Sequence, residues 1–155
     1  MELLKSLSVF KVSNAADENQ LEHIFYEAEN LATVEQKLGF RLPKELVSFY
    51  NEVGYGFFWQ KHKDSFDRLL SPAQLAQITL KEDFYGDDPD LELYDDLYQG
   101  DKLLFFEVNE GVFLAIDKAD HNGRNKVYYF ENKIYDSLEE FLNGLISNPK
   151  LTTSF

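Results

Sequence analysis

The twenty residues from Lys37 to Gly56, KLGFRLPKELVSFYNEVGYG, place the strictest limits on the fold of this chain. Gly39 suits the left-handed backbone position just past the end of a short helix. Pro43 fits the first position of the next helix, where its missing N–H costs no hydrogen bond. Gly54 and Gly56 predict a tight turn into a strand that is buried on both faces. We therefore expect two short helices and the first core strand within one unit, and the rest of the chain as cover or extension of it.

A further helix is predicted before this unit, over residues 17–31, because apolar residues recur there on one helical face. These residues are Leu21, Ile24, Phe25 and Ala28. Residues 7–12, LSVFKV, are expected to form either a short edge strand or a simple lead-in.

Three later positions carry helix start signals, in which a Ser or Thr cap is followed by Pro or by Gln or Glu. The pairs are Thr33 with Gln36, Ser71 with Pro72, and Ser137 with Glu140. The last of these helices should end at Asn148-Pro149, and the tail KLTTSF is expected to fray.

The last third of the chain reads as a series of short strands separated by tight turns. The predicted strands are Leu103–Val108, Val112–Asp117, Val127–Phe130 and Lys133–Tyr135, with a hairpin signal at Asn122-Gly123. Such strands pair in antiparallel fashion. We therefore expect residues 1–155 to form one α+β domain. Its antiparallel, twisted sheet would have about four to six strands, with the N-terminal helices and the C-terminal helix packed on one face.

Charge limits the classes of partner. The chain has 28 acidic and 15 basic residues, for a formal net charge of −13. This balance argues against nucleic-acid binding and against docking on anionic membranes, since both need Lys and Arg. It favours a basic protein partner or plain solubility. The N-terminus is too short and mixed for a signal peptide, and no apolar stretch is long enough to span a membrane. We therefore expect a cytosolic protein. We also expect it to be a monomer or a weak dimer.

The sequence lacks the residue patterns of most catalytic and metal-binding sites. The chain has no cysteine, which rules out disulfides and thiolate sites. His23, His62 and His121 lack zinc-ligand spacing, and His23 is expected on a helix as a satisfied or exposed residue. A calcium loop with Gly123 in sixth position would put Lys118 first, which would repel the ion. Carboxylates are plentiful, but nothing selects an acid–base pair. We therefore expect no enzyme, metal or cofactor.

The strongest functional candidate is the segment Glu82–Asp101, which holds nine acidic residues and neither Lys nor Arg. It is expected to form a surface loop or short helix that its aromatic residues pin in place. Two readings stay open: an acidic surface that meets a basic partner, or a solvated segment whose aromatic residues only close the core. Candidate contacts are Asp87, Asp88, Asp90, Glu92, Tyr94, Asp95, Asp96 and Tyr98, with Tyr55 and Trp59 on the strand after the Lys37–Gly56 unit.

A short helix ending in LGFRLPKEL, followed by the helix VSFYNEV, a glycine and a strand, resembles the SUKH superfamily. Residues 67–75, 103–117 and 136–142 resemble further family segments in the same order, so the likeness runs from about residue 18 to 147. Family members include bacterial immunity proteins of polymorphic toxin systems and fungal cell-wall assembly regulators. One departure is Val53 before Gly54, where members often carry Asn.

The resemblance implies a non-catalytic, cytosolic immunity protein that blocks a cognate toxin, often a nuclease. A toxin with a basic surface would suit a chain of charge −13, which would act there as a phosphate mimic. One alternative is a regulatory interaction module like the fungal members. The other is an enzyme or small-ligand binder, which a deep pocket with converging carboxylates would favour.

Overall fold

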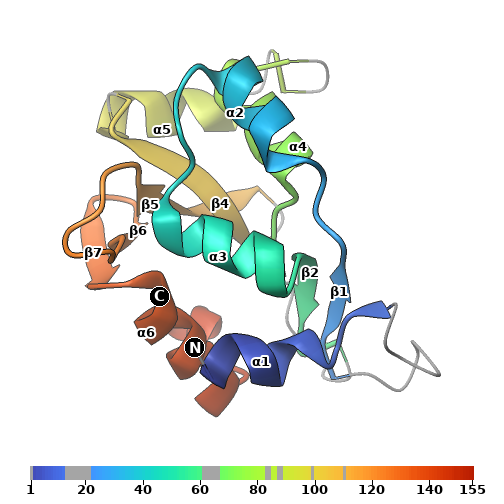
Figure 1. Cartoon of the computed structure of the whole chain (residues 1–155). Coiled ribbons are helices and arrows are strands. Elements are labelled where there is room, and N and C mark those ends of the chain that lie inside the picture. The colour runs from blue at the N-terminus through green and yellow to red at the C-terminus, as the bar shows by residue number, and fades with distance from the viewer. Residues whose placement is uncertain are drawn as a thin grey trace.

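Within the described residues, a seven-stranded antiparallel sheet runs through the molecule, and each strand pairs with its neighbours in sequence (Figure 1). The computed structural model describes residues 2–12, 22–60, 67–82, 85–86, 89–98, 100–109 and 111–155. The strands are β1 (Ile24–Tyr26), β2 (Tyr55–Phe58), β3 (Asp67–Leu69), β4 (Lys102–Asn109), β5 (Val112–Asp117), β6 (Val127–Tyr129) and β7 (Asn132–Tyr135). The expected α+β class with an antiparallel sheet is confirmed, with one strand more than the expected range.

The helices occur before, between and after the strands. They are α1 (Glu2–Ser8), α2 (Leu31–Leu38), α3 (Lys44–Glu52), α4 (Pro72–Leu80), α5 (Pro89–Tyr98) and α6 (Leu138–Ser147), followed by a 3-10 helix at Leu151–Ser154. None of the described helices has the length and apolar character needed to cross a lipid bilayer.

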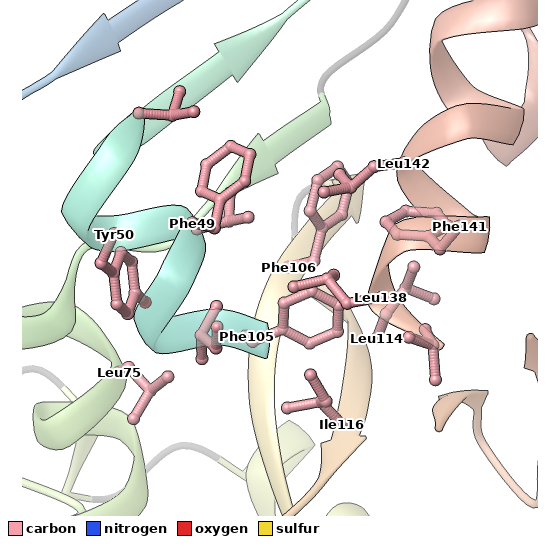
Figure 2. Close-up of a cluster of buried hydrophobic side chains, with 14 of the residues drawn as sticks. Phe49, Tyr50, Leu75, Phe105, Phe106, Leu114, Ile116, Leu138, Phe141 and Leu142 are labelled. Atoms are coloured by element: carbon pink, nitrogen blue, oxygen red, sulfur yellow. The ribbon is translucent and has the colours of Figure 1, made fainter. Parts of the chain in front are cut away.

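The main core lies between one face of the sheet and the helices α1, α3 and α6. Its aromatic centre is visible in Figure 2, where Phe49 of α3 and Phe141 of α6 point toward Phe105 and Phe106 of β4. Phe106 meets Phe141 edge-on, with ring centroids 5.1 Å apart. The two neighbouring phenylalanines share this face because the β4–β5 register shifts between Leu104 and Phe106.

A second, smaller core covers the other face of the sheet, which corrects the expectation that the helices pack on one face. Leu104, Phe113 and Ala115 of the central strands are buried there against residues of α5. Alternate residues of β5 therefore serve opposite cores, and Leu114 and Ile116 belong to the main one. α5 thus lies in a different layer from α3 and α6.

The Lys37–Gly56 unit forms largely as expected. α2 ends at Gly39, which has a left-handed φ of 84°, and α3 begins directly after Pro43, which occupies the cap position and not the first helical turn. β2 has one buried face, since Gly56 and Phe58 are buried while Tyr55 and Phe57 are half-buried.

The helix predicted over residues 17–31 is wrong, because Ile24–Tyr26 forms the edge strand β1. The prediction also extended over residues 17–21, which lie outside the described part of the chain. Gly54, directly before β2, and Gly56 within it make this pairing possible. A Cβ on Gly54 would lie 1.9 Å from the carbonyl oxygen of Tyr26, and one on Gly56 would lie 2.1 Å from that of Ile24. The glycines thus provide the close approach of β1, besides the turn that the sequence indicated.

The N-terminal stretch also differs from expectation. Residues 2–8 form α1, so of the two forms expected for residues 7–12 the edge strand is not formed, although Lys11 makes a single parallel bridge with Phe25. α2 begins earlier than predicted, since Asn30 and not Thr33 is its cap. The Asn30 side chain accepts hydrogen bonds from two backbone N–H groups, at 2.9 and 3.3 Å.

The other two start signals are confirmed. Ser71 and Gln74 form a reciprocal capping box with Pro72 in the first turn of α4. Ser137 caps α6 by accepting a hydrogen bond from the Glu140 N–H at 3.1 Å. The C-terminal tail does not fray, because the 3-10 helix buries Thr152 against the sheet.

Candidate functional site

The candidate site is the helix α5, which covers the outer face of β4 and β5. Leu91, Tyr94 and Tyr98 recur at helical spacing and are buried in the smaller core. The same core holds Leu70 from the end of β3 and Ile78 from α4. The part of the acidic segment from Pro89 to Tyr98 is therefore a helix fixed to the sheet. The sequence had left open a surface loop or a short helix.

Both tyrosines of α5 are buried anchors with satisfied hydroxyls. Tyr94 is 4% exposed and its oxygen accepts a hydrogen bond from the Phe113 N–H at 2.9 Å. Tyr98 is 7% exposed and donates to the carbonyl oxygen of Phe130 at 2.9 Å. The Tyr94 ring also stacks on Phe130 with centroids 5.5 Å apart. Burial raises the pKa of Tyr98 far above its ordinary value, so its proton stays in this hydrogen bond.

The tyrosines thus close the core, as the second interpretation of the segment had it, while the two described acidic side chains of α5 face solvent. Glu92 and Asp95 are exposed on α5. Asp90 and Asp96 are on the same helix, but their side chains lie outside the described part, as do Asp87 and Asp88 altogether. Asp95 forms an ion pair with Lys81 at the end of α4, which ties the two helices together.

Trp59 and Tyr55 are not part of the α5 surface. Trp59 is 9% exposed and belongs to the main core, on the opposite face of the sheet. Its indole N–H donates to the carbonyl oxygen of Leu145 at 2.8 Å, which joins the end of β2 to α6. Tyr55 is half-buried next to Tyr26, with ring centroids 5.8 Å apart.

A cavity of about 230 Å³ lies between α4, α5 and β4. Three lysines line it, Lys81, Lys102 and Lys118, and Asp95 is the single carboxylate. Lys102 lies 4.4 Å from the Tyr128 ring centroid and 3.5 Å from a carboxylate oxygen of Asp117. The described lining of this cavity holds one carboxylate and not the pair that acid–base hydrolysis would use.

The histidines and carboxylates show no metal site in the described part of the chain. His23 is buried beside β1, not on a helix, and its Nδ1 accepts a hydrogen bond from the Trp59 N–H at 2.9 Å. Burial lowers the pKa of His23 to about 4, so the ring is neutral and is satisfied as a structural residue. His121 lies in the turn that Arg124 closes, and His62 is outside the described residues.

A buried carboxylate that the sequence did not reveal is Asp67 at the start of β3. It is fully buried, and Thr152 of the C-terminal 3-10 helix donates a hydrogen bond to its Oδ1 at 2.7 Å. Its Oδ2 has no hydrogen-bond partner. Burial raises the pKa of Asp67 to about 6. Its partner is 85 positions away, so no local pattern marks this pair.

Two exposed leucines on α5 were also missed. The sequence did not single out Leu93 and Leu97, which face solvent. A helical projection shows why: Leu91, Tyr94 and Tyr98 already fill one face, and positions 93 and 97 fall on another. In the sequence, the spacing of apolar residues in two separate rows was the signal that could have indicated an exposed row.

Comparison with known proteins agrees with the architecture. A SUKH family model, described as SMI1-KNR4 cell-wall, matches residues 28–142. A relative from Bacillus subtilis (strain 168), Immunity protein YxxD, is 37% identical over 131 residues, which cover 83% of this chain and 87% of the relative. No solved structure matches the chain significantly. The chain therefore belongs to the SUKH family.

Proposed function

We propose that this protein is a cytosolic immunity protein that binds a cognate polymorphic toxin, a nuclease with a basic surface, and neutralises it one-to-one. Family membership and the name of the Bacillus relative support the immunity role. The observation that supports the surface is α5, which is anchored on the outer face of the sheet and carries exposed carboxylates. No Lys or Arg interrupts the acidic residues between Glu82 and Asp101.

The proposed mechanism is steric and electrostatic blockade. Carboxylates on α5 would occupy the positions of nucleic-acid phosphates on the toxin. Since the buried Tyr94 and Tyr98 hold the helix by hydrogen bonds to neighbouring strands, its carboxylates are preorganised and little ordering is needed on binding. Opposite charge also steers the encounter, and salt screens this attraction.

The proposed contacts are the acidic members of the segment, with Tyr55 as a separate candidate near β2. They are Asp87, Asp88, Asp90, Glu92, Asp95 and Asp96. Tyr94 and Tyr98 support this surface from the interior, since both are buried in the smaller core, whereas Trp59 is buried in the main core on the opposite face of the sheet.

The test is toxin binding across a salt series for a variant in which Asp87, Asp88, Asp90, Asp95 and Asp96 are changed to Asn. The partner is the toxin domain encoded by the neighbouring gene, purified in a catalytically inactive form. We expect a higher Kd at low salt and a shallower dependence of log Kd on salt than in the wild type.

A matched control removes five negative charges elsewhere, with Gln at Glu2, Glu22, Glu27, Glu52 and Glu131. These side chains are exposed and lie outside α5. If binding depends only on net charge, the two variants will lose affinity equally. An unchanged Kd and salt slope in the Asn variant would reject the acidic surface, whereas lack of toxin binding by the wild type would reject the immunity role.

A second candidate function is a regulatory protein-interaction module, which the cell-wall description of the matching family model favours. Such a module would bind endogenous proteins. Co-purification separates the two functions, since an immunity protein should retain the product of an adjacent toxin gene. Recovery of several endogenous proteins without a toxin would favour the regulatory role.

A further inference from the structure

Two leucines on α5 are exposed even though the helix buries a complete apolar row. Leu93 is 53% exposed and Leu97 is 37% exposed. They are four positions apart and therefore lie side by side along one face of the helix. The contact with the sheet is made by Leu91, Tyr94 and Tyr98. The exposed pair is thus an apolar strip that no other part of the described chain covers.

Acidic residues flank this strip in an arrangement that does not favour the isolated helix. Glu92 adjoins Leu93 and is exposed, so it places a negative charge at the edge of the strip. Asp95 and Asp96 lie in the last turn, where the helix dipole disfavours negative charge. The ion pair with Lys81 offsets this cost for Asp95. The combination of exposed leucines and carboxylates therefore indicates a docking surface.

We infer that Leu93 and Leu97 form the apolar centre of the surface that docks on the basic partner, with Glu92 and Asp95 in its polar rim. The inference rests on the proposed function and names the residues that supply affinity, as distinct from charge attraction. Interfaces combine a centre that excludes water with a polar rim. The matching surface on the partner is an apolar recess flanked by Lys or Arg.

A second copy of this chain fits the strip less well. If α5 met α5 of another copy, Glu92 and Asp95 would face carboxylates of like charge across the interface, which disfavours pairing. Charge complementarity therefore favours a basic protein as the occupant.

The test uses the catalytically inactive toxin domain encoded by the neighbouring gene. Leu93→Ala and Leu97→Ala are each expected to raise its Kd about tenfold, mainly through faster dissociation, and to do so at low and high salt alike. Val9→Ala is the matched control, because Val9 is an exposed apolar residue next to α1, at 58%. This control should leave the Kd unchanged.

The double variant Leu93→Ala/Leu97→Ala separates docking from folding. Its Tm should stay within about 2 °C of the wild type, because the side chains are exposed. A fall of about 10 °C would assign the leucines to the core and overturn the inference. An unchanged Kd in the double variant would also overturn the inference, but it would leave the proposed function intact. A dimer of the free chain that the double variant abolishes would make a second copy the occupant. A toxin domain that fails to bind the wild type would reject both proposals.

Discussion

Glu45 and Asn125 exchange two hydrogen bonds although 80 positions separate them in sequence. The Glu45 N–H donates to Asn125 Oδ1 at 3.2 Å, and the Asn125 N–H donates to Glu45 Oε1 at 2.6 Å. The same carboxylate accepts hydrogen bonds from the N–H groups of Leu138 and Glu139, at 3.0 and 3.1 Å. Glu45, in the LPKEL motif, therefore fastens the first turn of α6 and the loop before β6 to α3.

We expect Glu45→Ala to destabilise the protein by about 2–4 kcal/mol, because it leaves three backbone donors without their acceptor. Glu45→Gln keeps one acceptor oxygen and should cost less. Urea unfolding monitored by circular dichroism measures both changes. The control is Glu52→Ala at the exposed end of α3, which should stay within about 0.5 kcal/mol of the wild type. Equal losses for Glu45 and Glu52 would contradict the assigned role.

Gly56→Ala should separate β1 from the sheet. Its φ is 148°, and the added Cβ would lie 2.1 Å from the carbonyl oxygen of Ile24. We expect a loss of more than about 3 kcal/mol, since both backbone strain and a backbone clash arise. Gly123→Ala provides the comparison: its φ is 80°, but nothing lies within 4 Å of the added Cβ, so about 1 kcal/mol is expected. Amide hydrogen exchange at Ile24 and Tyr26, which pair with Phe57 and Tyr55 of β2, would report the loss of β1. Unchanged protection there in Gly56→Ala would count against the role assigned to Gly56.

The parts of the fold that were predicted correctly depend on local signals. Gly39 at the end of α2 and the Ser71 capping box act within a few residues, so the sequence alone reveals them. β1 was misread because Ile24 and Phe25 fit a helical spacing as well as a strand. Residues distant in sequence determine that this segment is a strand, since only the absence of a side chain at Gly54 and Gly56 lets β1 approach β2. Tertiary pairing overrode the local pattern.

In the candidate site, too, local sequence signals reveal some features, whereas contacts with distant residues determine the others. The run of carboxylates is visible in the sequence, and it predicted an acidic segment held by aromatic residues. Whether Tyr94 faces inward or outward depends on the outer face of the sheet, where the Phe113 N–H needs its hydroxyl as an acceptor. Sequence spacing alone could not choose between Tyr94 and Leu93 as the exposed apolar residue.

His23 makes the stability depend on pH in the mildly acidic range. Its pKa in the folded protein is about 4, below the ordinary value of 6.5, because burial disfavours the charged ring. The unfolded chain therefore binds a proton more readily than the folded one. The stabilisation is complete above pH 6.5 and is lost as the pH falls toward 4, by up to about 3 kcal/mol. His23→Asn, whose oxygen can accept from the Trp59 N–H, should unfold with a weaker dependence on pH in this window. An identical dependence in both proteins would contradict this prediction.

Asp67 should act in the opposite direction. Its pKa in the folded protein is about 6, above the ordinary value of 3.8, because burial disfavours the carboxylate. The folded state therefore holds the proton more tightly than the unfolded state, and this contribution to stability is complete below pH 3.8 and lost as the pH rises through 6. Asp67→Asn removes the ionisation but keeps an oxygen that can accept from Thr152. We expect it to be more stable than the wild type by about 1–3 kcal/mol at pH 7.5, with no gain below pH 3.8.

The comparison of Asp67→Asn with Thr152→Val separates charge from contact. Thr152 donates the one hydrogen bond that the buried carboxylate receives, so its loss should destabilise the protein most at pH 7.5, where Asp67 is ionised. The two substitutions are thus expected to shift the urea midpoint in opposite directions at neutral pH. Because both alter the same pair, their effects should not add: once Asn occupies position 67, Thr152→Val should cost less than in the wild type. Additive shifts in the double variant would show that the C-terminal 3-10 helix is held by other contacts and that the burial of Asp67 does not depend on it.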